Sequence, residues 1–310
     1  MTSRRKKSAG DDEVLDRGCP RDFIAAFGKG LAVIQAFSES TPALTLSGVA
    51  QRTGLTRATA RRFLLTLESL GFAERLDGKL FVLTPRVLLL GHAYLSSMPM
   101  WRFAEPVLER LVEDIGETCS LSVLDGTEVV YVLRIPVHRV LNRISTVGSR
   151  LPAYCTSMGR LLLSSLPEDK LDAYLAQTAF IGYTDKTVAD PLALRRHLAL
   201  VRRTGYAWVS GEMEEHINGL AVPVHDANGK VIAALNVSVR RPEVDAEAFL
   251  RRTLPTLRRA AQRLSNSMIV SGSAGECLSA GKRSRRVRTP PPFQTSRRKT
   301  HEHAPFPIGA

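Results

Sequence analysis

Cationic and hydroxyl side chains are concentrated in one short stretch of this 310-residue chain: Arg57, Thr59, Arg61, Arg62 and Thr66. If the stretch is helical, these side chains share one face, and apolar side chains occupy the opposite face. Guanidinium groups bind phosphates and guanine edges, whereas hydroxyl and methyl groups contact other base edges. The pattern therefore predicts a helix that lies in the major groove of double-stranded DNA.

The residues around this stretch have the features of a helix-turn-helix. We expect a first helix from Ser47 to Thr53 and a tight turn at Gly54. Thr56 is a candidate N-cap, because its hydroxyl can accept a hydrogen bond from the first free amides of the second helix. Gly71 is expected to end that helix. The expected buried face of the second helix consists of Ala60, Phe63, Leu64, Leu67 and Leu70.

A β-hairpin is predicted directly after the second helix. Phe72–Leu76 and Lys79–Leu83 are the two expected strands, and Asp77-Gly78 between them is typical of a type I′ turn. Two helices followed by a hairpin are the order of a winged helix. The alternative is that the basic face is only solvated, since small three-helix units also occur in proteins that bind no DNA. The predicted DNA-binding residues are Ser47, Thr56, Arg57, Ala58, Thr59, Arg61, Arg62 and Thr66, with Lys79 on the wing.

Composition and charge narrow the class of protein. The formal net charge is +13, but the central part of the chain is nearly balanced, which argues against a protein that coats nucleic acid along its whole length. No apolar run approaches the roughly 20 residues of a membrane span, and no apolar segment follows the basic N-terminus as in a secretory signal. We therefore expect a cytoplasmic protein. The four cysteines, Cys19, Cys119, Cys155 and Cys277, have no zinc-binding spacing, so neither metal nor cofactor is expected.

The chain divides into five expected parts. Residues 1–20 are polar and expected to be disordered, 21–84 form the winged helix-turn-helix, and 85–100 form a linker helix. Residues 101–270 form the second domain, and 271–310 are a basic, proline-bearing tail that is expected to be disordered. The tail either adds non-specific affinity for phosphates or has no role. In the winged helix, a first helix begins at Phe27 with the expected apolar stripe Leu31, Ile34 and Phe37.

Strand and helix patterns alternate in the second domain in the manner of an α+β fold. Strands flank a central block of helices, and short turns such as Asp125-Gly126 join neighbouring strands, so the sheet is expected to be mainly antiparallel. The expected strands are Thr118–Leu124, Glu128–Leu133, Arg139–Thr146, Tyr206–Ser210, Leu220–His225 and Val231–Val239, and the expected helices are Phe103–Ile115, 156–165, 167–177, 190–204 and Asp245–Ile269.

One helix start in this domain could bind an anion. Ser157, Met158 and Gly159 begin a helix after an irregular loop, where free amides and the helix dipole attract a carboxylate. Asn236 and Ser238 are two residues apart on a strand and so share one face of the sheet. Apolar walls with a few polar groups suit a small aromatic or keto acid. The expected walls are Leu121, Val123, Leu220 and Val222.

Four segments of the sequence carry a resemblance to a known family. They are GKGLAVIQAF (Gly28–Phe37), LGHAYLSS (Leu90–Ser97), VGSRLPAYCTSMGR (Val147–Arg160) and VIAALNVSV (Val231–Val239). The chain resembles the IclR family of bacterial transcription regulators over about residues 24–268, and in particular the branch that controls aromatic-acid catabolism through the β-ketoadipate pathway. The resemblance implies a homodimer or a dimer of dimers with an effector bound in the C-terminal domain. The candidate effectors it implies are protocatechuate, 4-hydroxybenzoate, muconate and β-ketoadipate.

The resemblance also implies which residues contact the effector. The family's contact positions fall on Ser157, Met158, Glu212, Val222, Asn236 and Ser238. Glu212 would repel an anionic effector unless its carboxylate is protonated or paired with a hydroxyl or an arginine. Arg134 and Arg150 could pair with an acidic ligand, and we include Arg150 among the effector-binding residues, although surface or dimer-contact roles are open alternatives.

An enzyme is the main alternative function. No GxSxG or HExxH motif and no nucleotide-binding glycine loop occurs, and Cys155 has no histidine at a defining distance in sequence, so no catalytic residue is proposed. The alternative would be an enzyme acting on a small carboxylic acid with an appended DNA-binding module.

The linker helix is expected to pair with its counterpart in a second copy of the chain. Its apolar run Val87–Leu90, with Ala93 and Leu95, exceeds what one helix needs against its own domain.

Overall fold

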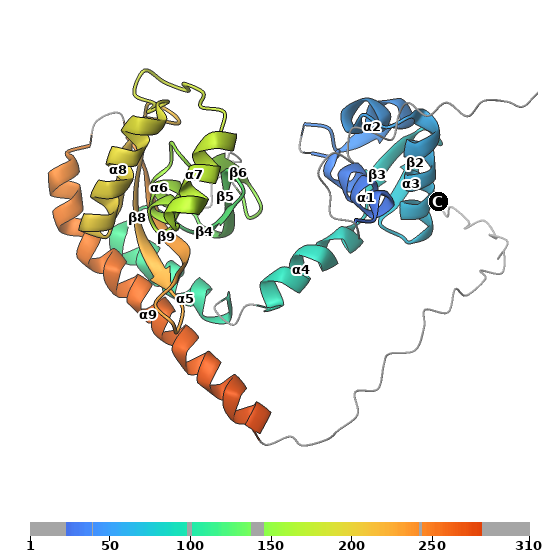
Figure 1. Ribbon diagram of the computed structural model, residues 1–310. Helices are drawn as coiled ribbons and strands as arrows, with labels where there is room; N and C mark the ends of the chain where they lie inside the picture. The colour runs from blue at the N-terminus through green and yellow to red at the C-terminus, as the bar shows by residue number, and fades with distance from the viewer. Residues whose placement is uncertain (1–22, 39, 98–100, 138–145, 242–243, 281–310) are drawn as a thin grey trace, which may run out of the picture.

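The computed structural model describes residues 23–38, 40–97, 101–137, 146–241 and 244–280, which form a small N-terminal unit, a connecting helix and a larger C-terminal unit (Figure 1). The N-terminal unit contains three helices and a three-stranded antiparallel sheet of strand order β1-β3-β2. Its elements are α1 (Ala25–Gln35), β1 (Ala43–Thr45), α2 (Leu46–Thr53), α3 (Arg57–Ser69), β2 (Ala73–Leu76) and β3 (Leu80–Leu83).

Local signals in the sequence account for the turns of this unit. Gly54 has a φ of 66° at the end of α2, a left-handed conformation that glycine adopts without strain. The hairpin turn has positive φ at both Asp77 (47°) and Gly78 (71°), as a type I′ turn requires. The winged helix-turn-helix is thus present with the expected order of elements. Strand β1, which pairs with β3, was not expected from the sequence.

The buried face of α1 agrees only in part with the expected stripe. Ile34 and Phe37 pack against the core as expected and Val33 and Ala36 are buried, whereas Phe27 and Leu31 are exposed. The face that packs carries the small residue Gly30, and the ring of Phe63 from α3 lies next to it. Because α1 has more apolar residues than one face can bury, close approach of the small residues decides which face turns inward. The sequence also places Leu70 in the core, but this residue follows the last residue of α3 and is exposed.

The connecting segment is a short 3-10 helix, η1 (Pro85–Val87), followed by α4 (Leu88–Ser97). No residue of α4 is buried. Leu88, Leu89, Leu90 and Tyr94 are all exposed, with 73% of Leu88 accessible. An apolar helix that none of the described residues covers is an unusual surface for a soluble monomer.

The C-terminal unit is built on a six-stranded antiparallel sheet of strand order β6-β5-β4-β9-β8-β7, which confirms the expected α+β class with an antiparallel sheet. Two helices, α5 and α9, cover one face, and α6, α7 and α8 lie on the other (Figure 1). The elements are α5 (Trp101–Ile115), β4 (Thr118–Asp125), β5 (Glu128–Ile135), β6 (Arg150–Pro152), α6 (Ser157–Ser164), α7 (Glu168–Gln177), α8 (Pro191–Thr204), β7 (Ala207–Ser210), β8 (Ile217–His225), β9 (Val231–Arg240) and α9 (Ala246–Ala280).

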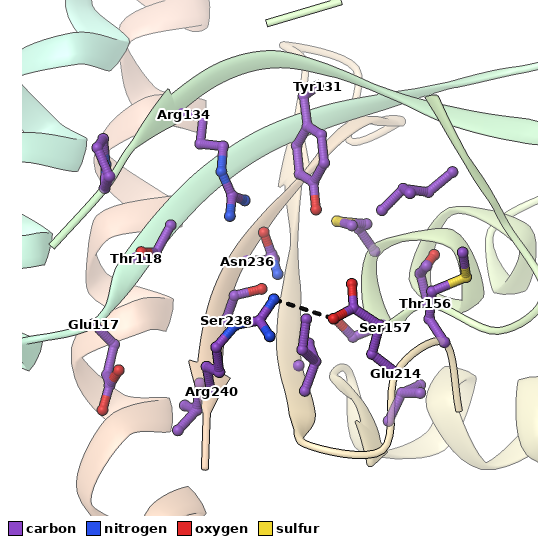
Figure 2. A pocket seen from close by; sticks show the side chains of 18 of the residues that line it. Glu117, Thr118, Tyr131, Arg134, Thr156, Ser157, Glu214, Asn236, Ser238 and Arg240 are labelled. Atoms are coloured by element: carbon purple, nitrogen blue, oxygen red, sulfur yellow. Dashed lines mark hydrogen bonds and ion pairs between the residues drawn. The ribbon is translucent and has the colours of Figure 1, made fainter. Parts of the chain in front are cut away.

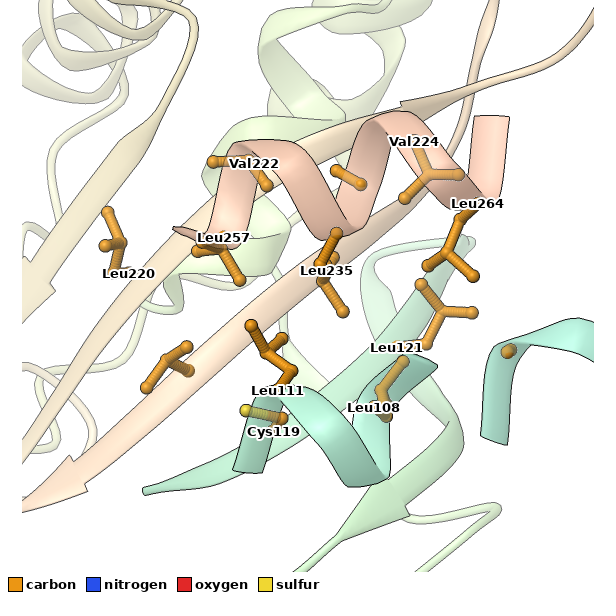
Figure 3. Close-up of a cluster of buried hydrophobic side chains, with 14 of the residues drawn as sticks. Leu108, Leu111, Cys119, Leu121, Leu220, Val222, Val224, Leu235, Leu257 and Leu264 are labelled. Atoms are coloured by element: carbon orange, nitrogen blue, oxygen red, sulfur yellow. The ribbon is translucent and has the colours of Figure 1, made fainter. Parts of the chain in front are cut away.

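Alternation along the strands separates an apolar face from a polar face. Val222 pairs with Leu235, and Leu220 pairs with Val237, so all four side chains lie on the same face. This face packs against α5 and α9 and excludes solvent completely at Val222 (Figure 3). Asn236 and Ser238 point to the opposite face.

The expectation that Val222 contacts an effector beside Asn236 and Ser238 is therefore wrong. Leu121 and Leu220 also belong to the core cluster beneath α5 and α9, and Val123 packs against it. The reason is that neighbouring residues of a strand point to opposite faces of the sheet, whereas residues paired across two strands point to the same face.

Two further boundaries differ from expectation. Helix α9 continues to Ala280, ten residues beyond the expected domain end at 270, and no proline interrupts that extension. Strand β6 was not expected, and the expected strand Arg139–Thr146 lies almost wholly outside the described residues. The expectation that the disordered tail begins at residue 271 is therefore wrong for residues 271–280, which are helical; segments 1–20 and 281–310 lie outside the described residues. None of the described helices is long and apolar enough to cross a membrane.

Two glycines permit the close approach of α6 to its surroundings. A Cβ atom at Gly159 would lie 2.0 Å from the carbonyl oxygen of Ala153, and a Cβ atom at Gly219 would lie 2.6 Å from Ser157 Oγ. The first contact is with rigid backbone. The start of α6 is therefore held against both the preceding loop and strand β8.

We predict that Gly159→Ala destabilises the C-terminal unit by about 1–3 kcal/mol or more, because the added methyl group has no space and the backbone must shift. Urea unfolding would measure this. Gly182→Ala is the matched control, since nothing lies within 4 Å of its Cβ position. Equal unfolding midpoints for the two variants would contradict the packing argument.

Candidate functional site

The second helix of the helix-turn-helix presents the expected polar face to solvent. Thr56 is its N-cap: Oγ1 accepts a hydrogen bond from the Thr59 amide at 3.2 Å and donates to Thr59 Oγ1 at 2.9 Å. Arg57, Arg61 and Arg62 are exposed. Ala58 and Thr66 are also exposed, Thr59 is partly buried, and Ala60, Leu64 and Leu67 face the core.

Other parts of this surface lie beside α3. Ser47 at the start of α2 and Lys79 on the wing are exposed. No carboxylate of the described residues pairs with Arg57, Arg61 or Arg62, so these guanidinium groups are available to phosphates or bases. Arg75 differs from them, because it pairs with Glu68 at 2.9 Å and lies over the ring of Phe81.

A cavity of about 840 Å³ opens on the polar face of the C-terminal sheet (Figure 2). Strands β4, β5, β8 and β9, the start of α6 and the loop after β7 form its walls. Its volume is sufficient for a small organic molecule. Among the residues that line it are Thr118, Tyr131, Arg134, Cys155, Ser157, Met158, Glu212, Met213, Asn236, Ser238 and Arg240.

Two rows of polar side chains cross the floor of the cavity. Ser120 on β4 pairs with Arg134 on β5 and with Asn236 on β9, so these three residues lie side by side across three strands. Arg134 Nη1 donates to Ser120 Oγ at 2.9 Å, and its guanidinium lies 5.0 Å from the ring centre of Tyr131. In the second row Thr118 pairs with Ser238. The register thus gathers polar groups from distant parts of the sequence.

Asn236 is buried, with 1% of its surface exposed, yet its side chain has no hydrogen-bond partner among the described residues. Its Oδ1 is fully enclosed, and the amide lies next to Arg134 and Tyr131 in the cavity (Figure 2). An unsatisfied buried amide costs about 1–3 kcal/mol, so a polar group of a ligand would be stabilised here.

The start of α6 forms another polar wall. Thr156 caps the helix by accepting from the Gly159 amide at 3.2 Å. Ser157 and Met158 are buried and line the cavity. Within the part of the chain that the structure describes, the amide N–H groups of these two residues have no acceptor. Such amides, at the positive end of a helix dipole, favour an anion.

Glu212 also lines the cavity, but its charge is balanced. Glu212 Oε2 accepts from Arg160 Nη2 at 2.7 Å and from the Val188 amide at 2.9 Å. Pairing with an arginine is one of the conditions under which Glu212 would not repel an acidic ligand. Burial lowers the pKa of Arg160, and the adjacent Glu212 opposes that shift.

Ion pairs also occupy the rim. Arg240 contacts Glu214 at 3.1 Å, as the dashed line in Figure 2 shows, and Arg241 contacts Glu117 at 2.5 Å. These carboxylates are therefore paired with cations. Arg134 differs, because no carboxylate of the described residues pairs with it.

The structure does not bring every predicted effector contact to this cavity. Arg150 lies outside it and pairs with Asp125 at 2.8 Å and Glu128 at 2.6 Å, with 43% of its side chain exposed. These contacts favour the alternative that Arg150 is a surface arginine. Ser157, Met158, Glu212, Asn236 and Ser238 all line the cavity, and their contact with an effector stays a prediction.

Sequence reasoning gave too little weight to Arg134 and missed Tyr131 and Arg160. A signal for the first existed, because β4 and β5 carry Ser120, Ser122 and Arg134 among apolar residues. Polar residues at period two in a buried strand indicate a second, polar face. Arg160 gave no such signal, since its partner Glu212 is distant in the sequence.

The thiol in the cavity is not suited to nucleophilic attack. Burial raises the pKa of Cys155 to about 12, so the thiol stays protonated at neutral pH. Its Sγ lies 3.8 Å from Met213 Sδ. Among the described residues, no group of three or more histidine, cysteine, aspartate or glutamate side chains could hold a metal ion.

Comparisons with known proteins agree with this architecture. The IclR helix-turn-helix domain matches residues 26–77, and the bacterial transcriptional regulator IclR C-terminal domain matches residues 92–266. The Pca regulon regulatory protein of Pseudomonas putida is 40% identical over 248 residues, which are 80% of this chain and 85% of that protein. The p-hydroxybenzoate hydroxylase transcriptional activator of Acinetobacter baylyi is 36% identical over 79% of this chain and 92% of its own length.

A solved structure shows the same fold. An IclR homolog from Microbacterium hydrocarbonoxydans, complexed with 4-hydroxybenzoate, superposes with a TM-score of 0.67 at 29% identity, and the match covers 78% of this chain and 98% of that chain. Fold, element order and sequence similarity extend over both units of the described chain. This protein therefore belongs to the IclR family of bacterial transcriptional regulators.

Proposed function

We propose that this protein regulates genes of aromatic-acid catabolism by binding double-stranded DNA through α3 and the wing and a small aromatic acid in the C-terminal cavity. The observation that carries the choice of ligand is Arg134, a cation in the cavity with no carboxylate partner among the described residues. The regulatory names of two relatives and the 4-hydroxybenzoate of a solved homolog support the same class of effector.

The charge of the cavity favours an acid. Glu212, Glu214 and Glu117 each pair with an arginine, so Arg134 and the start of α6 remain to attract an anion. A carboxylate beside Arg134 would receive charge-assisted hydrogen bonds, which are roughly twice as strong as neutral ones. Asn236 and Ser238 can bind a second polar group.

The apolar part of the cavity favours an aromatic ring. Cys155, Met158 and Met213 place sulfur-containing side chains in the wall, and Tyr131 and Leu151 also line the cavity. Sulfur contacts with aromatic rings stabilise by about 0.3–1.5 kcal/mol each. A hydroxybenzoate fits these features better than a sugar, which needs many more polar partners.

The relatives named here are transcriptional regulators, and our proposal for this chain includes no catalytic step. The protonated Cys155 thiol disfavours the alternative of an enzyme acting on a small carboxylic acid. As a bacterial DNA-binding regulator, the protein would act in the cytoplasm, where its DNA lies. The exposed apolar residues of α4 support assembly into a homodimer or a dimer of dimers.

For DNA binding, we expect Arg57→Ala and Arg61→Ala each to weaken binding to a native promoter fragment by about 1–3 kcal/mol if the arginine contacts a base in a bidentate manner. A phosphate contact would instead weaken binding to all sequences and reduce the dependence on salt. Fluorescence anisotropy at two salt concentrations distinguishes the two. Arg195→Ala is the control, because that arginine lies on α8 of the C-terminal unit and pairs with Glu168. If a variant with both substitutions binds the promoter fragment with wild-type affinity, α3 is not the helix that binds DNA.

For assembly, we expect sedimentation velocity to show a dimer or larger species at micromolar concentration. Leu89→Lys should shift the protein toward monomer, because a charge replaces apolar surface that the partner would cover. Leu192→Lys is the control, since Leu192 is also exposed (67%, against 59% for Leu89) but lies on α8. A wild-type monomer that still binds DNA would rule out pairing through α4.

For the effector, calorimetry with benzoate, 4-hydroxybenzoate and 3,4-dihydroxybenzoate should detect binding to the wild-type protein. Arg134→Met should weaken that binding by about 1.5–3 kcal/mol, because a charged hydrogen bond is lost. Arg150→Met is the matched control, since Arg150 is an arginine outside the cavity. Absence of both heat and thermal stabilisation with all three acids would defeat the effector class and leave the DNA-binding proposal intact.

A further inference from the structure

Arg160 and Glu212 form a buried ion pair directly behind the wall of the cavity. Their side chains are 3% and 7% exposed, and the contact measures 2.7 Å. Glu212 lines the cavity, whereas Arg160 does not. An acid bound in the cavity would therefore lie beside the Glu212 carboxylate, and the Arg160 cation that compensates this charge lies further from the ligand.

Both members of the pair are held in place by backbone groups. Arg160 Nε donates to the carbonyl oxygen of Tyr154 at 2.9 Å, and Glu212 Oε2 also accepts from the Val188 amide at 2.9 Å. Thr187 Oγ1 additionally donates to the Glu212 carbonyl oxygen at 2.6 Å. Neither charge can turn away to solvent without breaking these bonds, so the pair is a fixed part of the site.

The two charges act on the cavity wall in opposite directions. At Cys155, whose pKa is raised mainly by burial, the Glu212 charge raises the pKa further and the Arg160 charge lowers it. The neighbouring His197 does not replace Arg160, because burial, together with the Arg160 charge, lowers its pKa and so disfavours the charged imidazolium. The net field of Glu212 at the wall thus depends on Arg160.

We infer that Arg160 determines the selectivity of the cavity for anionic over neutral ligands, by compensating the charge of Glu212. Arg160 is in this sense a positioning and charge-balancing residue that needs no contact with the ligand. The inference rests on the proposed acid-binding function. It also gives Glu212 a role that needs no direct contact with the effector, since its Oε2 is paired with Arg160 and Val188 on the side away from the cavity.

The test compares binding of 4-hydroxybenzoate and its neutral amide, 4-hydroxybenzamide, by calorimetry on the full-length protein. Glu212→Gln keeps the shape and an acceptor for Arg160 but removes the negative charge, so the ratio of acid to amide affinity should rise about tenfold. Arg160→Met leaves Glu212 without a cation, so the ratio should fall about tenfold. The double variant should return to within about threefold of the wild-type ratio.

A role that is only structural would lower the affinity for acid and amide equally and leave their ratio unchanged. An unchanged ratio in Glu212→Gln overturns the inference, even if Arg160→Met fails to fold after loss of its buried charge. If the wild-type protein binds neither compound, the proposed acid effector fails and the inference falls with it. Binding of the acid with an unchanged ratio in Glu212→Gln rejects only the inference.

Discussion

The period of two along the strands of the C-terminal sheet is the constraint on which the site depends. Leu235 and Val237 face α5 and α9, so the alternate residues Asn236 and Ser238 must face the opposite side. Burial of the apolar set is worth about 1.5–3 kcal/mol for each large side chain, and it fixes the register. The register of the apolar set thereby also fixes the positions of Asn236 and Ser238 in the cavity.

Charge balance is the second requirement of the cavity. Three carboxylates lie in or around it, and each is matched by an arginine, one of them at the price of burying both partners. The buried pair of Arg160 and Glu212 costs desolvation energy that an apolar pair would avoid. The pair is also bonded to the Tyr154 carbonyl oxygen and the Val188 amide, and it gives a cavity wall that contains a carboxylate whose charge is balanced.

The N-terminal unit and α4 rely on surfaces that are incomplete within one chain. The cations of α3 have no carboxylate partner among the described residues, and the leucines of α4 have no cover. Both conditions are unfavourable in isolation and become favourable on contact with phosphates or with another apolar surface. Thr84 and η1 join the wing directly to α4, so the two surfaces belong to adjacent parts of the chain. This arrangement suits a regulator in which DNA binding and assembly are linked.

Short-range chemistry made much of this protein predictable from its sequence. The Thr56 cap, the left-handed Gly54 and the Asp77-Gly78 turn are set by residues adjacent in the chain, and so the winged helix-turn-helix and the α+β class follow from them and from periodicity. Only the tertiary structure decided that Arg134 and not Arg150 enters the cavity, that Val222 lies beneath the helices, and that Arg160 neutralises Glu212. These outcomes depend on cross-strand register and on contacts between segments far apart in sequence, which no local pattern encodes.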